Sequence, residues 1–312
     1  MAMDELRQAC AQVVKRARSV RIDAGAIPAY ADSLLEPSAA PAPVGALQSS
    51  TPRQRDWAAA FWLTLDAINF GSGWFPQLRK RAGASGYNTI ALGWREHHDA
   101  HGPFTAAHLA ELDAATVAAI VRQDPDHELM ALYAASLNDL GAHLEAEHDG
   151  RFLGPVEAAD GSAIGLARAL GAWDCFADVS SYGELSVPFL KRAQITAADL
   201  QRAGAARFDD LERLTMFADN LVPHVLRLDG VLRFDDELVV RIESGQLIAH
   251  GSAEEVEIRA CALHAVELIV AHLRRQRRSG VTAAAVDELL WNRGQGPRYK
   301  ALPRHRSRCT AY

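Results

Sequence analysis

Cysteine is scarce in this chain, and long apolar runs are missing altogether. The four cysteines, Cys10, Cys175, Cys261 and Cys309, lie far apart in 312 residues, and no CxxC pair occurs. This spacing argues against a structural zinc site and is typical of a reducing compartment, so we expect a cytoplasmic protein. Because no run of eighteen apolar residues exists, we expect no segment that spans a membrane.

The sequence also lacks a secretory signal and a positive net charge. Its first twenty residues carry scattered charges and no apolar stretch followed by a cleavage site. The net charge of −6 disfavours broad binding to a phosphate backbone, so we expect no stable complex with nucleic acid. Local basic clusters remain at 274–278 and 300–308.

Hydrophobic residues recur at helical spacing through most of the chain, which predicts a mainly α fold with few short strands. Helices are expected over 4–20, 27–35, 53–70, 105–122, 127–147, 163–170, 252 to 278, and from 282 onward. Residues 86–94 are expected to be a short strand or irregular, 196–199 to cap a short helix, and 36–43 to be a Pro/Ala linker. The length suits one compact domain, with two helical lobes (about 1–180 and 181–312, the site between them) as the alternative.

The stretch 215–226, TMFADNLVPHVL, carries the main candidate for chemistry. Its apolar run ends at Asp219, directly before a helical pattern with Pro223 in the first turn, where a missing N–H costs nothing. Asp219 is therefore predicted as the N-cap, with its carboxylate facing free backbone N–H groups and the positive end of the helix dipole. An aspartate in this position either only caps the helix or also takes part in a reaction.

Two further groups of polar residues are interpreted as structural. His97 and His101 have metal-ligand spacing, but Gly102-Pro103 follows at once, so a polar loop and no metal site are predicted. Four polar residues lie among the apolar positions of the helix expected from 252: Glu257, Arg259, His264 and Glu267. A buried structural network is favoured over the wall of a pocket, because buried polar groups are usually satisfied locally.

Five segments of the chain, in this order, resemble the queuosine salvage family, the queuosine 5′-phosphate N-glycosylases. They are 66–70 (DAINF), 189–194 (FLKRAQ), 216–223 (MFADNLVP), 254–259 (EEVEIR), and 290–291 (LW) followed by 305–309 (HRSRC). The resemblance covers most of the chain. It implies a helical fold distantly like that of the helix-hairpin-helix DNA glycosylases. It also implies hydrolysis of queuosine 5′-monophosphate to release queuine, with no metal or organic cofactor.

The residue types suit this chemistry. Breaking a ribosyl C–N bond develops positive charge at C1′, which a nearby carboxylate stabilises or captures, and Asp219 is the candidate. Queuine is a 7-deazaguanine, so protonation at N7 cannot activate it as a leaving group. The site therefore has to hold the base by its other edges and depends on stabilisation from the sugar side.

The resemblance also implies substrate contacts at Phe217, Asp287, Glu288, Asn292 and Gln48. Phe217 is expected to stack on the base, and Asp287 to pair with its N–H edge or with the secondary ammonium of the substrate. Some relatives have an aspartate in place of Asn292 and an aromatic residue in place of Glu288. For the 5′-phosphate the leading candidates are Lys191 and Arg192, because a monoester needs charge-assisted donors. Three arginines compete with them: Arg304, Arg306 and Arg308.

Two other functions remain open at this point. A helix, a glycine turn and a second short helix are expected before Asp219, which suggests a base-excision glycosylase acting on nucleic acid. The negative net charge and the absence of a hairpin glycine pattern count against it. The other alternative is a helical module that binds a modified base or tRNA without catalysis, which release of free base would exclude.

Overall fold

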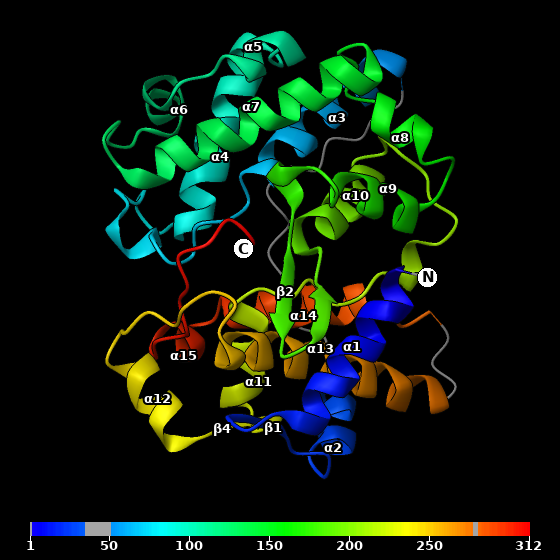
Figure 1. The fold of residues 1–312 in the computed structure, drawn as a ribbon, viewed down its shortest axis with the longest axis vertical. Coiled ribbons are helices and arrows are strands. Elements are labelled where there is room, and N and C mark those ends of the chain that lie inside the picture. Colours follow the sequence, from blue (N-terminus) through cyan, green and yellow to red (C-terminus); the bar gives the residue numbers. More distant parts are fainter. Residues whose placement is uncertain (1, 35–50, 277–279) are drawn as a thin grey trace. The chain divides into compact units, whose positions relative to one another are not determined.

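The computed structural model describes residues 2–34, 51–276 and 280–312 (Figure 1). Helices dominate these ranges, and the strands form two short antiparallel pairs, so the mainly α class is confirmed. The predicted linker and Gln48 lie outside the described residues. Within the described ranges, no helix combines the length and apolar character needed to cross a membrane.

The chain divides into two compact units, each assembled from separate segments. Unit 1 consists of 1–42, 179–191 and 212–308, and unit 2 of 43–178, 192–211 and 309–312. The chain therefore passes between the units several times, whereas the two-lobe alternative placed one boundary near residue 180. One passage falls between Lys191 and Arg192, so these neighbours belong to different units.

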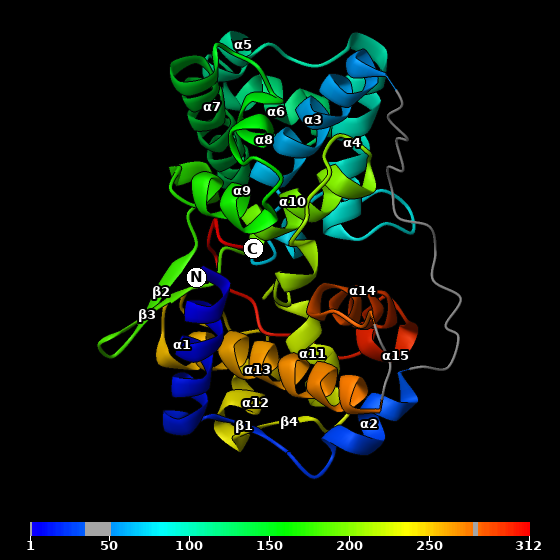
Figure 2. The same cartoon turned by 90° about the vertical axis from the view of Figure 1, so that its right-hand side faces the viewer.

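Unit 1 is built around its longest helix, α13 (Ala253–Arg275) (Figure 2). Every position of this helix from Glu255 to Val266 except His264 is buried. Helices α1 (Ala2–Arg16), α2 (Ile27–Ser33), α11 (Leu221–Leu228) and α14 (Ala283–Gly294) pack against it. Helices α12 (Asp236–Glu243) and α15 (Pro297–Lys300) complete the unit. The predicted starts of α13 and α14 near 252 and 282 are confirmed, and the Ser252 and Thr282 hydroxyls cap them by accepting the backbone N–H groups of Glu255 and Ala285.

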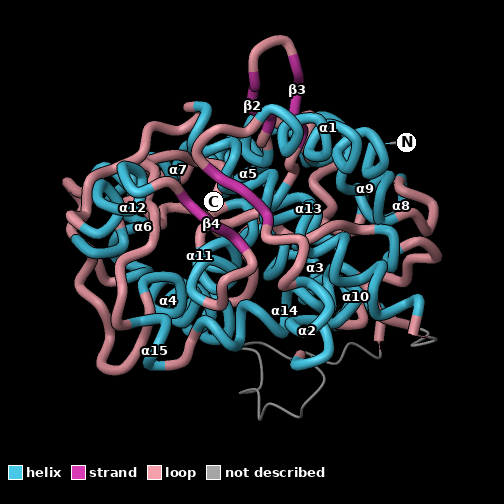
Figure 3. The backbone as a smooth tube through the Cα atoms, turned by 90° about the horizontal axis from the view of Figure 1, so that it is seen from below, coloured by secondary structure: helices cyan, strands magenta, loops and turns pink. Residues whose placement is uncertain are grey.

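Both strand pairs belong to unit 1 (Figure 3). Strand β1 (Val20–Ile22) pairs with β4 (Leu232–Phe234), and Val20 lies opposite Phe234. Strands β2 (Val179–Tyr182) and β3 (Leu185–Pro188) form a hairpin, with Gly183 at φ 59° in the predicted turn. This hairpin ends just before Phe189 and so leads into one of the segments that carry the family resemblance.

Unit 2 is an all-helical assembly around α7 (Glu128–His148). The other helices are α3 (Pro52–Ala67), α4 (Gly86–His101), α5 (Ala106–Ala110), α6 (Ala114–Val121), α8 (Gly154–Ala158), α9 (Ala163–Leu170) and α10 (Lys191–Arg202), whose first residue belongs to unit 1. Short 3-10 turns lie at Phe75–Gln77, Asp174–Phe176 and Leu211–Arg213. The predicted helix 163–170 is confirmed as α9, and the Ser162 hydroxyl caps it by accepting the Gly165 N–H at 2.9 Å.

The prediction of a strand or loop over 86–103 is wrong, because residues 86–101 form α4. Its two glycines look like helix breakers, but each allows close packing. A Cβ at Gly86 would lie 2.4 Å from Phe75 Cγ, and one at Gly93 would lie 2.9 Å from the Ile120 carbonyl oxygen. The side chain of Ser85 caps the helix by accepting the Asn88 N–H.

Three other predicted boundaries are also wrong. The expected helix 105–122 is two helices, since Asp113 caps α6 and interrupts the run. Helix α10 starts at Lys191, so Thr196 lies inside it and donates to the Arg192 carbonyl instead of capping. Helix α1 stops at Arg16, because the Glu257 carboxylate accepts the backbone N–H groups of 18, 19 and 20 and closes a turn there.

Gly141 tests the close packing of α5 on α7. A Cβ at this position would lie 2.5 Å from both the Ala106 carbonyl oxygen and the Ala110 nitrogen. Helix propensity alone predicts that Gly141→Ala stabilises the protein by about 0.5–1 kcal/mol. We expect the opposite sign, a loss of roughly 1–3 kcal/mol in the free energy of unfolding, because the backbone has to move.

Urea unfolding measures the effect, with the exposed neighbour Ala142→Gly as the control that reports propensity alone. A stabilised Gly141→Ala variant would contradict the packing of these two helices.

Candidate active site

Asp219 lies one residue before the N-cap position of α11, which Asn220 occupies without a side-chain cap bond, so the predicted cap is off by one residue. Oδ1 of Asp219 accepts the N–H groups of Leu221 at 2.8 Å and Val222 at 3.1 Å. Two backbone donors and the positive end of the helix dipole therefore hold a half-buried carboxylate in one orientation.

The backbone before Asp219 is held from two sides within unit 1. The Phe217 N–H donates to Asp287 Oδ1 on α14 at 3.1 Å, and the Ala218 carbonyl accepts from Arg259 Nε on α13 at 2.9 Å. On the far side, the Asn220 side chain donates to the His305 carbonyl at 3.0 Å. Helices α13 and α14 thus set the position of the Asp219 backbone.

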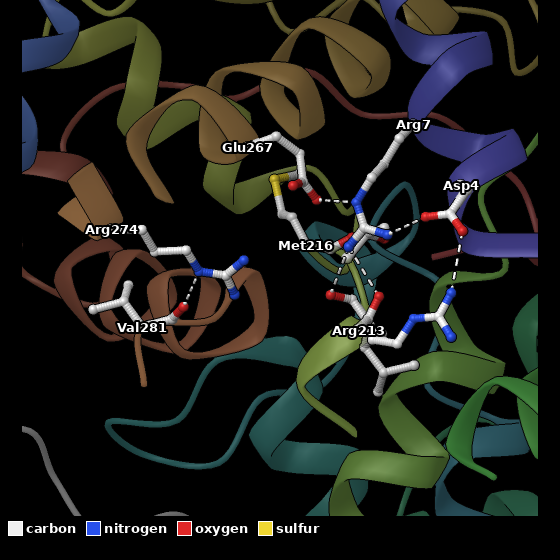
Figure 4. A network of polar contacts seen from close by, with 9 residues as sticks. Asp4, Arg7, Arg213, Met216, Glu267, Arg274 and Val281 are labelled. Atoms are coloured by element: carbon white, nitrogen blue, oxygen red, sulfur yellow. Dashed lines mark hydrogen bonds and ion pairs between the residues drawn. The ribbon is translucent and has the colours of Figure 1, made fainter. Parts of the chain in front are cut away.

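Helix α1 holds the backbone of residues 213 and 214, which precede this segment (Figure 4). Arg7 donates to the backbone carbonyls of Arg213 at 2.9 Å and Leu214 at 3.4 Å, and it pairs with Glu267 on α13 at 2.9 Å. Asp4 pairs with the side chains of both Arg7 and Arg213. These contacts give Glu267 a structural role, as the network interpretation predicts. Glu257 has one too, because it also accepts the Tyr182 hydroxyl.

Charged groups gather around Asp219. Burial raises the pKa of Asp287 well above its usual range, and the nearby Asp219 carboxylate raises it further, while the Phe217 N–H and Lys191 act in the opposite direction. Burial lowers the pKa of the Arg304 guanidinium, and Asp219 acts against that shift. The site therefore combines two carboxyl groups in different environments with two cations nearby.

The structure brings most of the predicted residues together in unit 1. Phe217, Asp219, Asp287 and Lys191 are linked by the hydrogen bond and the charge effects above, and the exposed Glu288 also acts on the Asp287 carboxyl. Half-buried Asn292 follows Glu288 by one turn of α14. Of the competing arginines, Arg304 has a charge that interacts with Asp219, whereas Arg306 donates to the Gly245 carbonyl.

Arg192 lies apart from this group, in the core of unit 2. Its side chain is fully buried, and Nη1 donates to the backbone carbonyls of Ala67 and Cys175. Its guanidinium carbon also lies 5.1 Å from the centre of the Phe70 ring. Burial lowers the pKa of Arg192 to about 10, although nearby acidic groups oppose the shift. These contacts favour a structural role for Arg192.

The histidines considered for metal binding also lie in unit 2. His97 and His101 are on one side of α4, and their rings stack with centres 4.5 Å apart. The polar loop predicted at these residues is therefore a helix. Within the described ranges, no three His, Cys, Asp or Glu side chains form a group that fits a metal ion.

Asp287 makes the stability of the protein depend on pH. Because its pKa is raised, the folded protein holds a proton that the unfolded chain has released, so the parent loses stability as the pH rises from about 4 through the folded-state pKa. Asp287→Asn keeps an oxygen for the Phe217 N–H and cannot ionise. We therefore expect the free energy of unfolding of the variant, relative to the parent, to increase with pH between about pH 5 and 8.

Urea unfolding across this range provides the measurement. Asp113→Asn is the matched control, because the Thr116 N–H lowers the pKa of the exposed Asp113 and its effect is complete above about pH 4. Its difference from the parent should be flat over the same range. An equally flat difference for Asp287→Asn would contradict the buried carboxyl environment.

Comparison with known proteins gives consistent results over nearly the whole chain. A family model described as queuosine salvage protein matches residues 49–312. A relative from Sphaerobacter thermophilus, named queuosine 5′-phosphate N-glycosylase/hydrolase, is 36% identical and covers 96% of this chain and 95% of its own length. Relatives with the same name from Mus musculus and Bos taurus are 30% and 29% identical, each with 98% of both chains covered.

Proposed function

Since the chain belongs to the queuosine salvage protein family, we propose that it hydrolyses the N-glycosidic bond of queuosine 5′-monophosphate and releases queuine. The observation that carries the proposal is the Asp219 carboxylate, held by two backbone N–H groups beside a second carboxyl group and two cations. The names of the relatives supply the substrate, and the site supplies a suitable chemistry.

Asp219 is proposed to face C1′ of the ribose. As the C–N bond breaks, positive charge develops on the sugar, and a fixed carboxylate stabilises it electrostatically or captures C1′ as a nucleophile. The N–H donors at the start of α11 hold the carboxylate in place before the reaction, so little reorganisation is needed in the transition state. Water then completes the hydrolysis.

The base is proposed to bind between Phe217 and α14. Phe217 offers a ring for stacking, and Asp287 offers a carboxyl group for the guanine-like N–H edge or for the secondary ammonium of the substrate. An ammonium near Asp287 would lower the pKa of this carboxyl, because a cation favours its charged form. Glu288 and Asn292, on the same helix, are further proposed contacts, and so is Gln48, on which the structure is silent.

Lys191 is proposed to bind the 5′-phosphate. It is the first residue of α10, belongs to unit 1, and lies close enough to Asp287 to influence its ionisation. Phosphate monoesters bind well to ammonium groups. Arg192 is left out of the proposed phosphate site, because its Nη1 donors are used within unit 2.

We propose that the reaction takes place in the cytoplasm. All four cysteines are free and buried, which agrees with a reducing compartment. The proposed partners are the substrate and queuine, with no stable nucleic-acid complex.

Asp219→Asn tests the role of the carboxylate. Asn is as good an N-cap as Asp, so the variant should fold with only a small loss of stability. Turnover of queuosine 5′-monophosphate, followed as queuine by mass spectrometry, should fall at least about a hundredfold, since a group aimed at developing charge contributes roughly 3–4 kcal/mol.

The matched control is Asp235→Asn, a cap of α12 in the same unit whose Oδ1 accepts the Leu238 N–H at 2.7 Å. It should keep its turnover. Near-normal turnover in a folded Asp219→Asn variant would remove this residue from the chemistry, and an inactive parent protein would refute the proposed function.

Lys191→Met tests the phosphate contact. A hydrogen bond to a charged group contributes roughly 1.5–3 kcal/mol, so the parent should prefer queuosine 5′-monophosphate over queuosine in kcat/KM by about tenfold to a hundredfold. Lys191→Met should lose most of this preference while still cleaving queuosine. Exposed Lys300, in the same unit, provides the control variant Lys300→Met, which should keep the preference. Equal efficiencies for both substrates in the parent would argue against the assignment.

A further inference from the structure

Arg259 stands out among the buried charges of unit 1. It lies on α13 with no exposed surface, and a charge in such a place is costly unless it has good partners. Its ion pair with Glu255, also fully buried, has a closest distance of 3.6 Å. Although burial acts to raise the pKa of Glu255, a hydrogen bond from His250 and the charge of Arg259 lower it to about 2, so the pair is ionic.

The guanidinium of Arg259 also connects two segments of the candidate site. Its Nε donates to the carbonyl of Ala218, the residue directly before Asp219. The guanidinium also makes a cation–π contact with Phe189, with its carbon 3.9 Å from the ring centre. Phe189 precedes Lys191 by two residues.

The residue between them has an unusual backbone conformation. Leu190 has φ 51°, in the left-handed region that L-residues with a side chain seldom adopt. Such a conformation persists only where its surroundings determine it, and Leu190 is buried and follows directly on Phe189, whose ring is held by Arg259. The Phe189 ring therefore helps to set the direction in which Lys191 enters the site.

We propose that Arg259 is a positioning residue that aligns Asp219 and Lys191 with each other. One arm, the hydrogen bond to Ala218, sets the catalytic carboxylate. The other arm, the contact with Phe189, sets the phosphate-binding lysine. Both arms end on protein groups, so Arg259 acts through the segments that carry these two residues. The inference rests on the proposed function for its kinetic part and on the geometry alone for its structural part.

The two arms can be separated by mutation. Arg259→Met removes both, Arg259→Lys retains the charge and one donor without the planar group, and Phe189→Leu removes only the ring. Glu257→Gln is the matched control, a buried charge two residues away on α13 whose partners are the 18–20 turn and Tyr182. It should lower thermal stability and leave kcat unchanged.

Steady-state kinetics on queuosine 5′-monophosphate and queuosine should distinguish the arms. We expect kcat to fall about a hundredfold in Arg259→Met on both substrates, since a small misplacement of a reacting group has effects of this size. Arg259→Lys should have a kcat between those of Arg259→Met and the parent. Phe189→Leu should raise KM for the monophosphate about tenfold, because the ring no longer orients Lys191, and leave the kinetics on queuosine unchanged.

Hydrogen exchange provides a readout that does not depend on activity. The Leu221 and Val222 amides, which donate to Asp219, should exchange faster in Arg259→Lys and at the parent rate in Glu257→Gln. Unchanged exchange together with unchanged kcat in folded Arg259→Lys would overturn the positioning role. An inactive parent would refute the proposed function instead, and the exchange rates would still decide whether Arg259 orders this turn.

Discussion

Helix α13 carries Glu255, Glu257 and Arg259 at fully or almost fully buried positions, and each of these charges has to be compensated within unit 1. Glu257 is compensated by the backbone N–H groups that follow α1 and by a hydroxyl of the β2–β3 hairpin. Arg259 is compensated by Glu255, by the Ala218 carbonyl and by the Phe189 ring. The need to compensate these buried charges therefore fixes the turn after α1 and the β2–β3 hairpin. It also fixes the two chain segments of the candidate site that contain Phe189 and Ala218.

The two carboxyl groups of the site differ because their surroundings differ. Asp219 is half-buried and accepts two N–H groups at a helix start, whereas Asp287 is buried and accepts one. When two like charges lie close together in a poorly solvated place, one of them keeps its proton more readily, and here that is Asp287. This division suits a site in which one carboxylate serves the sugar and the other carboxyl group binds the base.

Local features were predictable from the sequence, and long-range ones were not. The starts of α9, α13 and α14 depend on caps at Ser162, Ser252 and Thr282 that bind N–H groups three positions away, so the local pattern is enough. The same pattern places Asp219 within one residue of the N-cap of α11. Helix α4 was missed because its glycines serve contacts with distant backbone, which the local pattern does not record. Lys191 and Arg192 are adjacent and similar in type, yet they belong to different units, and only the fold separates them. Arg259 was recognised as a charge among apolar residues, but its partners are some forty and seventy residues away along the chain.

The leaving group explains why the proposed site holds one carboxylate so firmly. A 7-deazaguanine cannot be activated by protonation at N7, so a larger share of the barrier has to be lowered at the sugar. A single charge can do this only if it is already in place, because reorganising it during the reaction would consume the stabilisation it provides. The bonds to Asp219 Oδ1, to the Phe217 N–H and to the Ala218 carbonyl come from three helices and leave this residue little freedom. On this argument, Arg259 of α13, whose bond ends on the Ala218 carbonyl, contributes to catalysis through the position of one carboxylate.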